Sequence, residues 1–155
     1  MYALLETLQG SEFATWMLES SYGYPVALTF HSMGLAIVVG LLLVLDLRVL
    51  GVARGLPLPA LRPVLRLVWA AFCVNAVTGL MIFVSDAVRY FESSSFRLKL
   101  LAVAIAMALV TPVARQLRAG VPADGRLPAS VRACALASIV LWLGAIVSGR
   151  LMAYV

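Results

Sequence analysis

A long apolar stretch at residues 25–50 limits the folds available to this chain more than any other feature. From Val26 to Leu45 the only ionisable side chain is that of His31, which is also the one histidine of the sequence. An α-helix needs about 20 mostly apolar residues to cross the hydrocarbon core of a bilayer. The stretch therefore predicts a transmembrane helix that carries a histidine inside the membrane. Ionisable groups at such depth usually face the interior of a helix bundle and indicate a function.

Three further apolar stretches extend this interpretation to most of the chain. Hydrophobic residues make up 63% of the 155 residues and charged residues only 12%, and the mean hydropathy is +1.02. Such values are not those of a soluble domain. We predict an all-α protein, a four-helix transmembrane bundle with spans at about residues 25–48, 66–90, 96–117 and 130–153. Residues 25–155 then form one transmembrane domain, which lies in a lipid bilayer.

The first 24 residues differ from the spans because polar and apolar side chains alternate along them. Gly10 divides this segment, and we predict a short helical piece on each side of it. Residues 1–10 have no basic start and no long apolar core, so we expect no signal peptide. We expect residues 1–24 to form an amphipathic segment at the membrane interface.

Basic residues are distributed unevenly between the two ends of the predicted bundle. The net charge is +5, but these residues gather at the ends of spans, which argues against nucleic-acid binding. The two loops after spans one and three contain Arg48, Arg54, Arg62, Arg66, Arg115, Arg118, Arg126 and Arg132, and the opposite end contains Arg89, Arg97, Lys99 and Arg150. Cytoplasmic loops carry the excess of such residues. We therefore expect a multi-pass protein of a bacterial inner membrane with both termini in the periplasm.

One ionisable residue of each span is predicted to lie at a similar depth in the half of the membrane nearer the termini. These residues are His31, Asp86, Lys99 and Arg150. Gly34 lies one helical turn from His31 and would let a flat group approach the backbone. Each residue also has a structural alternative. Lys99 and Arg150 can reach the lipid headgroups, Asp86 can be an ordinary helix-end residue, and His31 can be an interhelical hydrogen-bonding group.

No motif of a catalytic or phosphate-binding site occurs in the sequence. Cys73 and Cys134 are isolated in apolar segments and match no metal-binding spacing. With a single histidine, one chain cannot supply two histidine ligands to a haem. A second ligand would come from another subunit or from a methionine. Met17 and Met152 lie at a better depth for this than Met33, which faces away from His31.

Short motifs along nearly the whole chain resemble those of an uncharacterised family of small bacterial inner-membrane proteins. They are Ser11–Thr15, Ser21, Tyr24-Pro25, His31, Gly34, Asp46–Arg48, Leu50-Gly51, Thr78-Gly79, Phe83, Phe96-Arg97 and Lys99. More loosely, a first-span histidine with a third-span lysine is similar to two better-known groups. One is the haem-binding protoporphyrinogen oxidase of the J type, and the other is the copper-resistance membrane protein of the D type. The second resemblance implies binding of haem or copper.

The leading hypothesis is that the protein binds b-type haem, with His31 as the axial ligand, and serves electron transfer. Lys99, with Arg97 or Arg89, would neutralise the propionates. The first alternative is copper binding or transport at the periplasmic face through His31 and methionines. The second is a cofactor-free accessory or anchor subunit. We expect as partner a second copy of the chain, or a membrane or periplasmic redox protein. The predicted cofactor site comprises His31, Gly34, Asp86, Arg89, Arg97, Lys99 and Arg150.

Overall fold

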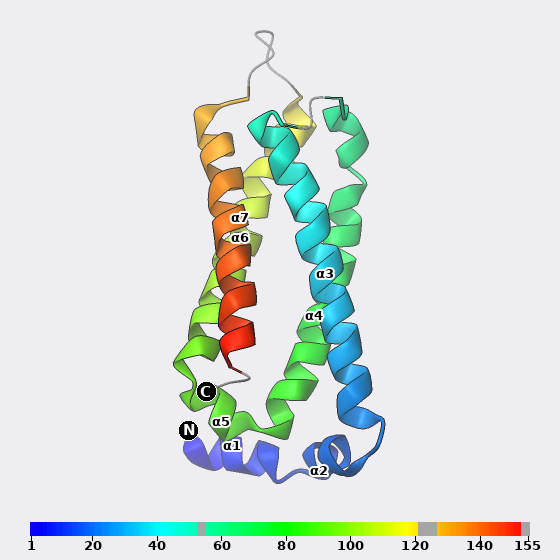
Figure 1. Cartoon of the computed structure of the whole chain (residues 1–155), viewed down its shortest axis with the longest axis vertical. Coiled ribbons are helices and arrows are strands. Elements are labelled where there is room, and N and C mark those ends of the chain that lie inside the picture. Colours follow the sequence, from blue (N-terminus) through cyan, green and yellow to red (C-terminus); the bar gives the residue numbers. More distant parts are fainter. Residues whose placement is uncertain (53–54, 121–126, 153–155) are drawn as a thin grey trace.

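The structure, a computed structural model, describes residues 1–52, 55–120 and 127–152. Its helices are α1 (Tyr2–Gln9), α2 (Glu12–Glu19), α3 (Gly23–Leu50), α4 (Val64–Ser85), α5 (Ala87–Glu92), α6 (Ser94–Ala119) and α7 (Ala129–Leu151), with a 3-10 helix η1 at Leu58–Leu61 (Figure 1). No strand occurs in these ranges, and the fold is all-α as predicted. Arg54, Arg126 and residues 153–155, on which some of the predictions above fall, lie outside the described residues.

Four helical segments of the described chain are long and apolar enough to cross a membrane: Gly23–Leu50, Leu58–Ser85, Ser94–Ala119 and Ala129–Leu151. This confirms the predicted four-span bundle. Large apolar side chains project outwards from every one of these segments, and Phe30, Val77, Leu101 and Leu143 are 50–61% exposed. Such an apolar exterior suits lipid and not water. The chain is therefore a multi-pass membrane protein.

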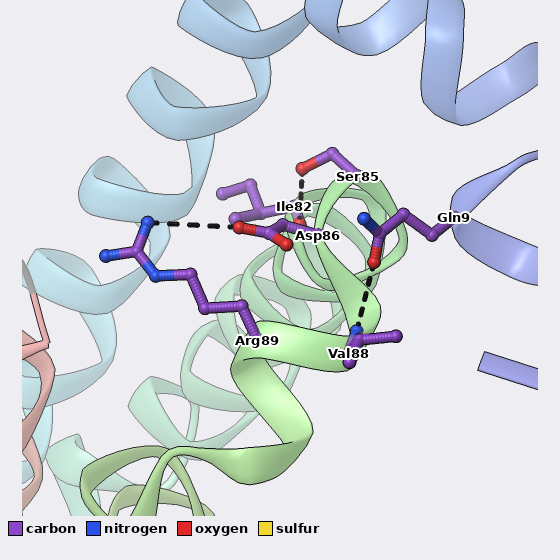
Figure 2. Close-up of polar contacts among 6 residues, drawn as sticks. All are labelled: Gln9, Ile82, Ser85, Asp86, Val88 and Arg89. Carbon is purple, nitrogen blue, oxygen red and sulfur yellow. Dashed lines mark hydrogen bonds and ion pairs between the residues drawn. The ribbon is translucent and has the colours of Figure 1, made fainter. Parts of the chain in front are cut away.

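The second span ends earlier than the sequence indicates. We predicted a span to residue 90, but α4 stops at Ser85 and the chain resumes as α5 after Asp86. Asp86 leaves the helical conformation, with φ −150° and ψ 56°. The backbone N–H of Val88 donates to Oε1 of Gln9 in α1 at 3.2 Å, and the Ser85 hydroxyl donates to the Ile82 carbonyl (Figure 2). A hydrogen bond from a distant segment thus stabilises a break that periodicity does not reveal.

Local sequence signals define several other helix ends. The Ser11 and Ser93 hydroxyls accept backbone N–H bonds and cap α2 and α6, which is the common role of serine at this position. Gly51 ends α3 with a φ of 92°, a left-handed conformation that favours glycine. Gly10 separates α1 from α2, as expected from the sequence.

Buried apolar residues form two clusters, one toward each end of the bundle. We call the half that contains α1, α2, α5 and the end of α7 the terminal half, and the half that contains η1 and the start of α7 the loop half (Figure 1). The larger cluster lies in the middle and the loop half and includes Val38, Leu42, Leu45, Val49, Val68, Met107, Val110, Val113, Ala135 and Trp142. The smaller cluster, Met17, Ala27 and Ile82, lies in the terminal half.

Helices α1 and α2 lie across the terminal end of the bundle (Figure 1). Each turns part of its apolar surface inward, where Leu5 and Met17 are buried. Other apolar side chains of α2 stay outside, and Trp16 and Leu18 are 52% and 61% exposed. This orientation suits a segment at a membrane interface.

Candidate functional site

His31 of α3 is joined to α4 by two hydrogen bonds with one residue. Its Nδ1 lies 2.9 Å from the backbone carbonyl oxygen of Asn75, and Nδ2 of Asn75 donates to the His31 carbonyl oxygen at 2.6 Å. The Thr78 hydroxyl oxygen lies 3.4 Å from the same Nδ1. Because the two bonds run in opposite directions, they fix α3 against α4 at this depth and orient the imidazole ring.

Two glycines allow this close approach of α3 and α4. A Cβ on Gly34 would lie 3.2 Å from the carbonyl oxygen of Ala71 and from the backbone nitrogen of Asn75. A Cβ on Gly79 would lie 2.9 Å from Cε1 of His31. The space beside Gly34 is therefore filled by α4. This corrects the expectation that Gly34 admits a flat group, because its role is close helix packing.

The Asn75 carbonyl determines which ring nitrogen of His31 carries the proton. A carbonyl oxygen only accepts, so Nδ1 is the donor in the 2.9 Å bond. A neutral imidazole has one N–H, so Nε2 keeps its lone pair. Within the described ranges, the hydrogen bonds of the ring all involve Nδ1. A ring whose Nδ1 donates to a backbone carbonyl has the usual orientation of a histidine that binds a metal through Nε2.

Lys99 of α6 is close enough to His31 to interact with it electrostatically. Its Cδ, Cε and Nζ run along α7, where a Cβ on Gly149 would lie 3.5–3.6 Å from them. In the part of the chain that the structure describes, its ammonium group has no ion pair or hydrogen bond. His31 and Lys99, two members of the predicted layer, thus lie within electrostatic range of each other. That they share a ligand site stays a prediction.

Asp86 and Arg89, two other predicted site residues, pair with each other and not with Lys99. Arg89 Nη1 and Asp86 Oδ2 lie 3.9 Å apart, and the side chains are 65% and 36% exposed (Figure 2). Pairs so exposed contribute little to stability. The structure thus pairs Asp86 with Arg89, and its place in the layer of His31 and Lys99 stays a prediction. Its charge is compensated at the break between α4 and α5.

Arg97 and Arg150, the remaining predicted site residues, are exposed. Arg97 Nη2 donates to the Ser94 hydroxyl oxygen at 3.2 Å on the surface of α6. Arg150 lies in the last turn of α7. Both positions suit side chains that reach the lipid headgroups.

Two of the methionines predicted as further ligands, Met17 and Met33, have different surroundings. Met17 is fully buried against Ala27 and Ile82, and Ala27 lies one helical turn before His31. Met33 is 54% exposed. Among the described residues, no group of three or more His, Cys, Asp or Glu side chains is placed to hold a metal ion. A copper site formed by His31 and methionines would require their ligand atoms to lie within bonding distance of one ion.

An aromatic cluster that sequence reasoning missed lies in the terminal half, where rings of α4, α5 and α6 meet. The ring centroids of Phe83 and Phe96 lie 5.5 Å apart in a stacked arrangement. The ring of Tyr90 lies 6.4 Å from Phe83 and 5.6 Å from Phe96. Burial, followed by the hydrogen bond with Tyr24, raises the pKa of Tyr90. The rings belong to α4, α5 and α6, so no single stretch of sequence reveals the cluster.

Asp46 is a second residue whose setting the sequence did not reveal. It is 2% exposed, and its Oδ2 atom has no hydrogen-bond partner among the described residues. The Ser138 hydroxyl of α7 interacts with its carboxyl group.

Comparison with known proteins identifies the family of this chain. A model described as a family of unknown function (DUF6644) matches residues 16–155. The chain belongs to this family, which confirms the likeness to an uncharacterised family. No curated protein and no solved structure matches the chain. The looser likeness to the haem-binding and copper-resistance groups stays a prediction.

Proposed function

We propose that this member of a family of unknown function binds b-type haem through Nε2 of His31 and serves electron transfer. A bound haem supplies a one-electron couple whose potential depends on the axial ligand and its surroundings. The residues of the chain have the separate task of holding the ligand nitrogen and balancing the negative charge of the propionates.

The hydrogen bond of 2.9 Å between Nδ1 of His31 and the Asn75 carbonyl carries this proposal. It places the proton on Nδ1, so the lone pair of Nε2 is free to bind iron. Such a bond also increases the basicity of the ligand nitrogen and fixes the ring plane. The contact of the ring with Gly79 restricts it further, since even a Cβ there would lie 2.9 Å from Cε1.

Lys99 supports the proposal through its charge. An ammonium group inside a membrane span is costly without an anion, and Lys99 has no carboxylate partner in the described chain. A haem propionate would supply that anion next to His31. Arg97 and Arg89, exposed near the same end of the bundle, would add cations for the second propionate.

We further propose that the protein lies in a bacterial inner membrane with both termini in the periplasm. Support comes from the excess of arginine in the loops at the opposite end. The haem would then lie in the periplasmic half of the membrane and exchange electrons with a membrane or periplasmic redox protein. Alkaline phosphatase fused after Val155 should be active, and a green fluorescent protein in the same place should be dark. The reverse pattern would invert this orientation.

Absorption spectroscopy of the detergent-purified chain from haem-replete cells tests the haem proposal. The wild-type protein should show a Soret band, and His31→Ala should lose it. Met33→Leu is the matched control, because Met33 lies close to His31 on α3 but is 54% exposed. This control should keep the band. Lys99→Met should keep the position of the band and lower the haem occupancy several-fold.

Two results would overturn the haem proposal. One is a colourless wild-type protein that also fails to take up added haemin. The other is a Soret band of full height in His31→Ala. A colourless protein that retains stoichiometric copper would favour the copper alternative, in which His31 is a copper ligand.

A cofactor-free anchor subunit is the second candidate, and the reciprocal His31–Asn75 bonds favour it. Polar side chains that bond across two helices stabilise membrane bundles without any ligand. On this proposal the isolated chain is colourless and His31→Ala weakens its association with a copurified membrane partner. The two candidates thus differ in the absorption spectrum of the wild-type chain.

A further inference from the structure

Three buried polar atoms in the loop half have no hydrogen-bond partner among the described residues. They are Oδ2 of Asp46 on α3 and, on α7, Oγ of Ser138 and Nε1 of Trp142. The three side chains are 2%, 3% and 3% exposed. Ser138 and Trp142 lie one helical turn apart on the buried face of α7. Asp46 lies one turn from Leu42 and Val49 of the larger apolar cluster.

The Ser138 hydroxyl is the side chain that interacts with the Asp46 carboxyl group. The interaction falls short of ordinary hydrogen-bond geometry, because neither Oδ2 of Asp46 nor Oγ of Ser138 has a partner by that criterion. A buried polar group without a partner is costly, and a buried charge without one is far more so. The surroundings of the Asp46 carboxyl group therefore favour its neutral, protonated form over the charged carboxylate.

No cation in the described residues compensates a charge on Asp46. Two basic side chains of the loop half bond elsewhere: Nε of Arg48, on α3 itself, donates to the Leu56 carbonyl, and Nε of Arg62 donates to the Leu117 carbonyl. Of the other titratable side chains on the helices around Asp46, the arginines are exposed and the cysteine is half-buried: Arg66, Arg115, Arg118, Arg132 and Cys134. The single ion pair of the described chain is that of Asp86 and Arg89.

Asp46 and Ser138 suit a neutral carboxylic acid better than a bound metal ion. A protonated carboxyl group has one O–H to donate and lone pairs to accept. A serine hydroxyl matches both functions. A metal ion would meet a single carboxylate and one hydroxyl. Hard cations instead select several oxygen ligands.

We propose that Asp46 and Ser138 form a proton-binding site within the membrane, in the core between α3 and α7. The carboxyl group of Asp46 takes its proton from water and holds it while the two helices are packed together. Release returns that proton to water and leaves a carboxylate with no cation beside it. The released state therefore requires solvent at Asp46, which the packed core does not admit. Proton release and separation of α3 from α7 are thus one coupled event.

Infrared spectroscopy of the full-length protein in lipid vesicles tests the proton site directly. At neutral pH the wild-type chain should show the C=O stretch of a protonated carboxyl group, shifted on exchange into deuterium oxide. Asp46→Asn should lose this band. Asp86→Asn is the matched control and should keep it, because Asp86 is 36% exposed and paired with Arg89. Ser138→Ala should keep the band and move it to higher wavenumber, since the carboxyl group loses its polar neighbour.

Absence of the band in the wild-type protein at neutral pH would overturn the proposal, and so would a band that persists in Asp46→Asn. If Asp46→Asn does not fold, the shift of the C=O band in Ser138→Ala becomes the test of the site. An unchanged band position in Ser138→Ala would then contradict the proposal. Both outcomes are independent of haem, because no part of the measurement uses His31.

Labelling of Cys134 tests the coupling between proton release and helix separation. Cys134 is half-buried and lies one turn before Ser138 on α7. In a Cys73→Ser background, a maleimide should react with Cys134 increasingly fast as the pH rises. The rise should be steeper with Asp46 present than in the Asp46→Asn variant, which shares the same thiol chemistry. Equal slopes in the two proteins would overturn the coupling.

Discussion

The two halves of the bundle deal with buried polar groups in opposite ways. In the terminal half, His31 and Asn75 satisfy each other through two bonds of 2.9 and 2.6 Å across the α3–α4 contact. In the loop half, Asp46, Ser138 and Trp142 each have an atom without a partner among the described residues, although all three are almost fully buried. In the first contact, the hydrogen bonds of the His31 ring within the described chain all involve Nδ1.

This difference shows that buried polar side chains can have different roles within one membrane bundle. Reciprocal bonds stabilise a contact and orient a ring, so the terminal half is rigid where His31 meets α4. Unpaired groups in a dense apolar core favour the neutral form of the acid, because no cation of the described residues would compensate a charge there. The proposals made above therefore differ between the halves: a ligand site in the terminal half and a proton site in the loop half.

The largest expected effect comes from the glycine contact that brings His31 and Asn75 together. Gly34→Ala should destabilise the protein by about 1–3 kcal/mol, because the new Cβ would lie 3.2 Å from backbone atoms of α4 that cannot yield easily. Gly40→Ala on the same helix is the control, since a Cβ there has nothing within 4 Å. Unfolding in mixed detergent micelles measures both. Equal stability of the two variants would mean that α3 and α4 do not pack as closely as described.

A smaller effect is expected from the polar pair itself. Asn75→Ala removes the 2.6 Å bond to the His31 carbonyl but keeps the backbone acceptor for Nδ1. The cost should be about 0.5–1.5 kcal/mol, which is typical of hydrogen bonds between membrane helices. The same unfolding measurement applies, with Val77→Ala, a 61% exposed position, as the control. If Asn75→Ala costs no more than this control, the terminal half owes its stability to apolar packing alone.

A weaker effect concerns Tyr90 and appears only in alkaline solution. The pKa of Tyr90 is raised above its ordinary 10.0, first by burial and then by Tyr24, so the folded state holds the phenolic proton more tightly than the unfolded state. Its contribution is fully present below pH 10 and is lost as the pH rises further. Tyr90→Phe should therefore lose stability less steeply above pH 10 than the wild type. Tyr22→Phe, at a position 76% exposed, should follow the wild-type slope.

The smallest expected effect is that of Lys99→Met on stability. Asp86 is paired with Arg89 and not with Lys99, so removal of the ammonium group leaves no carboxylate unpaired. The melting temperature should not fall, since no carboxylate loses its partner and an ammonium group inside a span is itself costly without an anion. A loss of a few kcal/mol would instead show that Lys99 compensates a buried carboxylate. That result would contradict the separation of Asp86 from the layer of His31.

Part of the candidate site was accessible from the sequence because it depends on depth. Counting residues along a span places His31 and Lys99 at a similar level, and the two lie within electrostatic range of each other. The same counting placed Asp86 with them, but the helix breaks at that residue and the carboxylate pairs locally with Arg89. The sequence did not show how each helix is rotated about its own axis. That rotation decides which face Gly34 presents to α4 and whether Asp46 is buried.

The sequence by itself determined the all-α class, the membrane setting and the four spans. Each of these depends on the length of an apolar segment and on the cost of exposing backbone groups to lipid, which are local properties. Only the tertiary structure decided the partner of each polar group. It paired His31 with Asn75, joined Gln9 to the break at Asp86, and placed Asp46 beside Ser138 with no ion pair to a described residue. Partners far apart in sequence meet through the packing of whole helices, and the rotation of each helix depends on all of its neighbours.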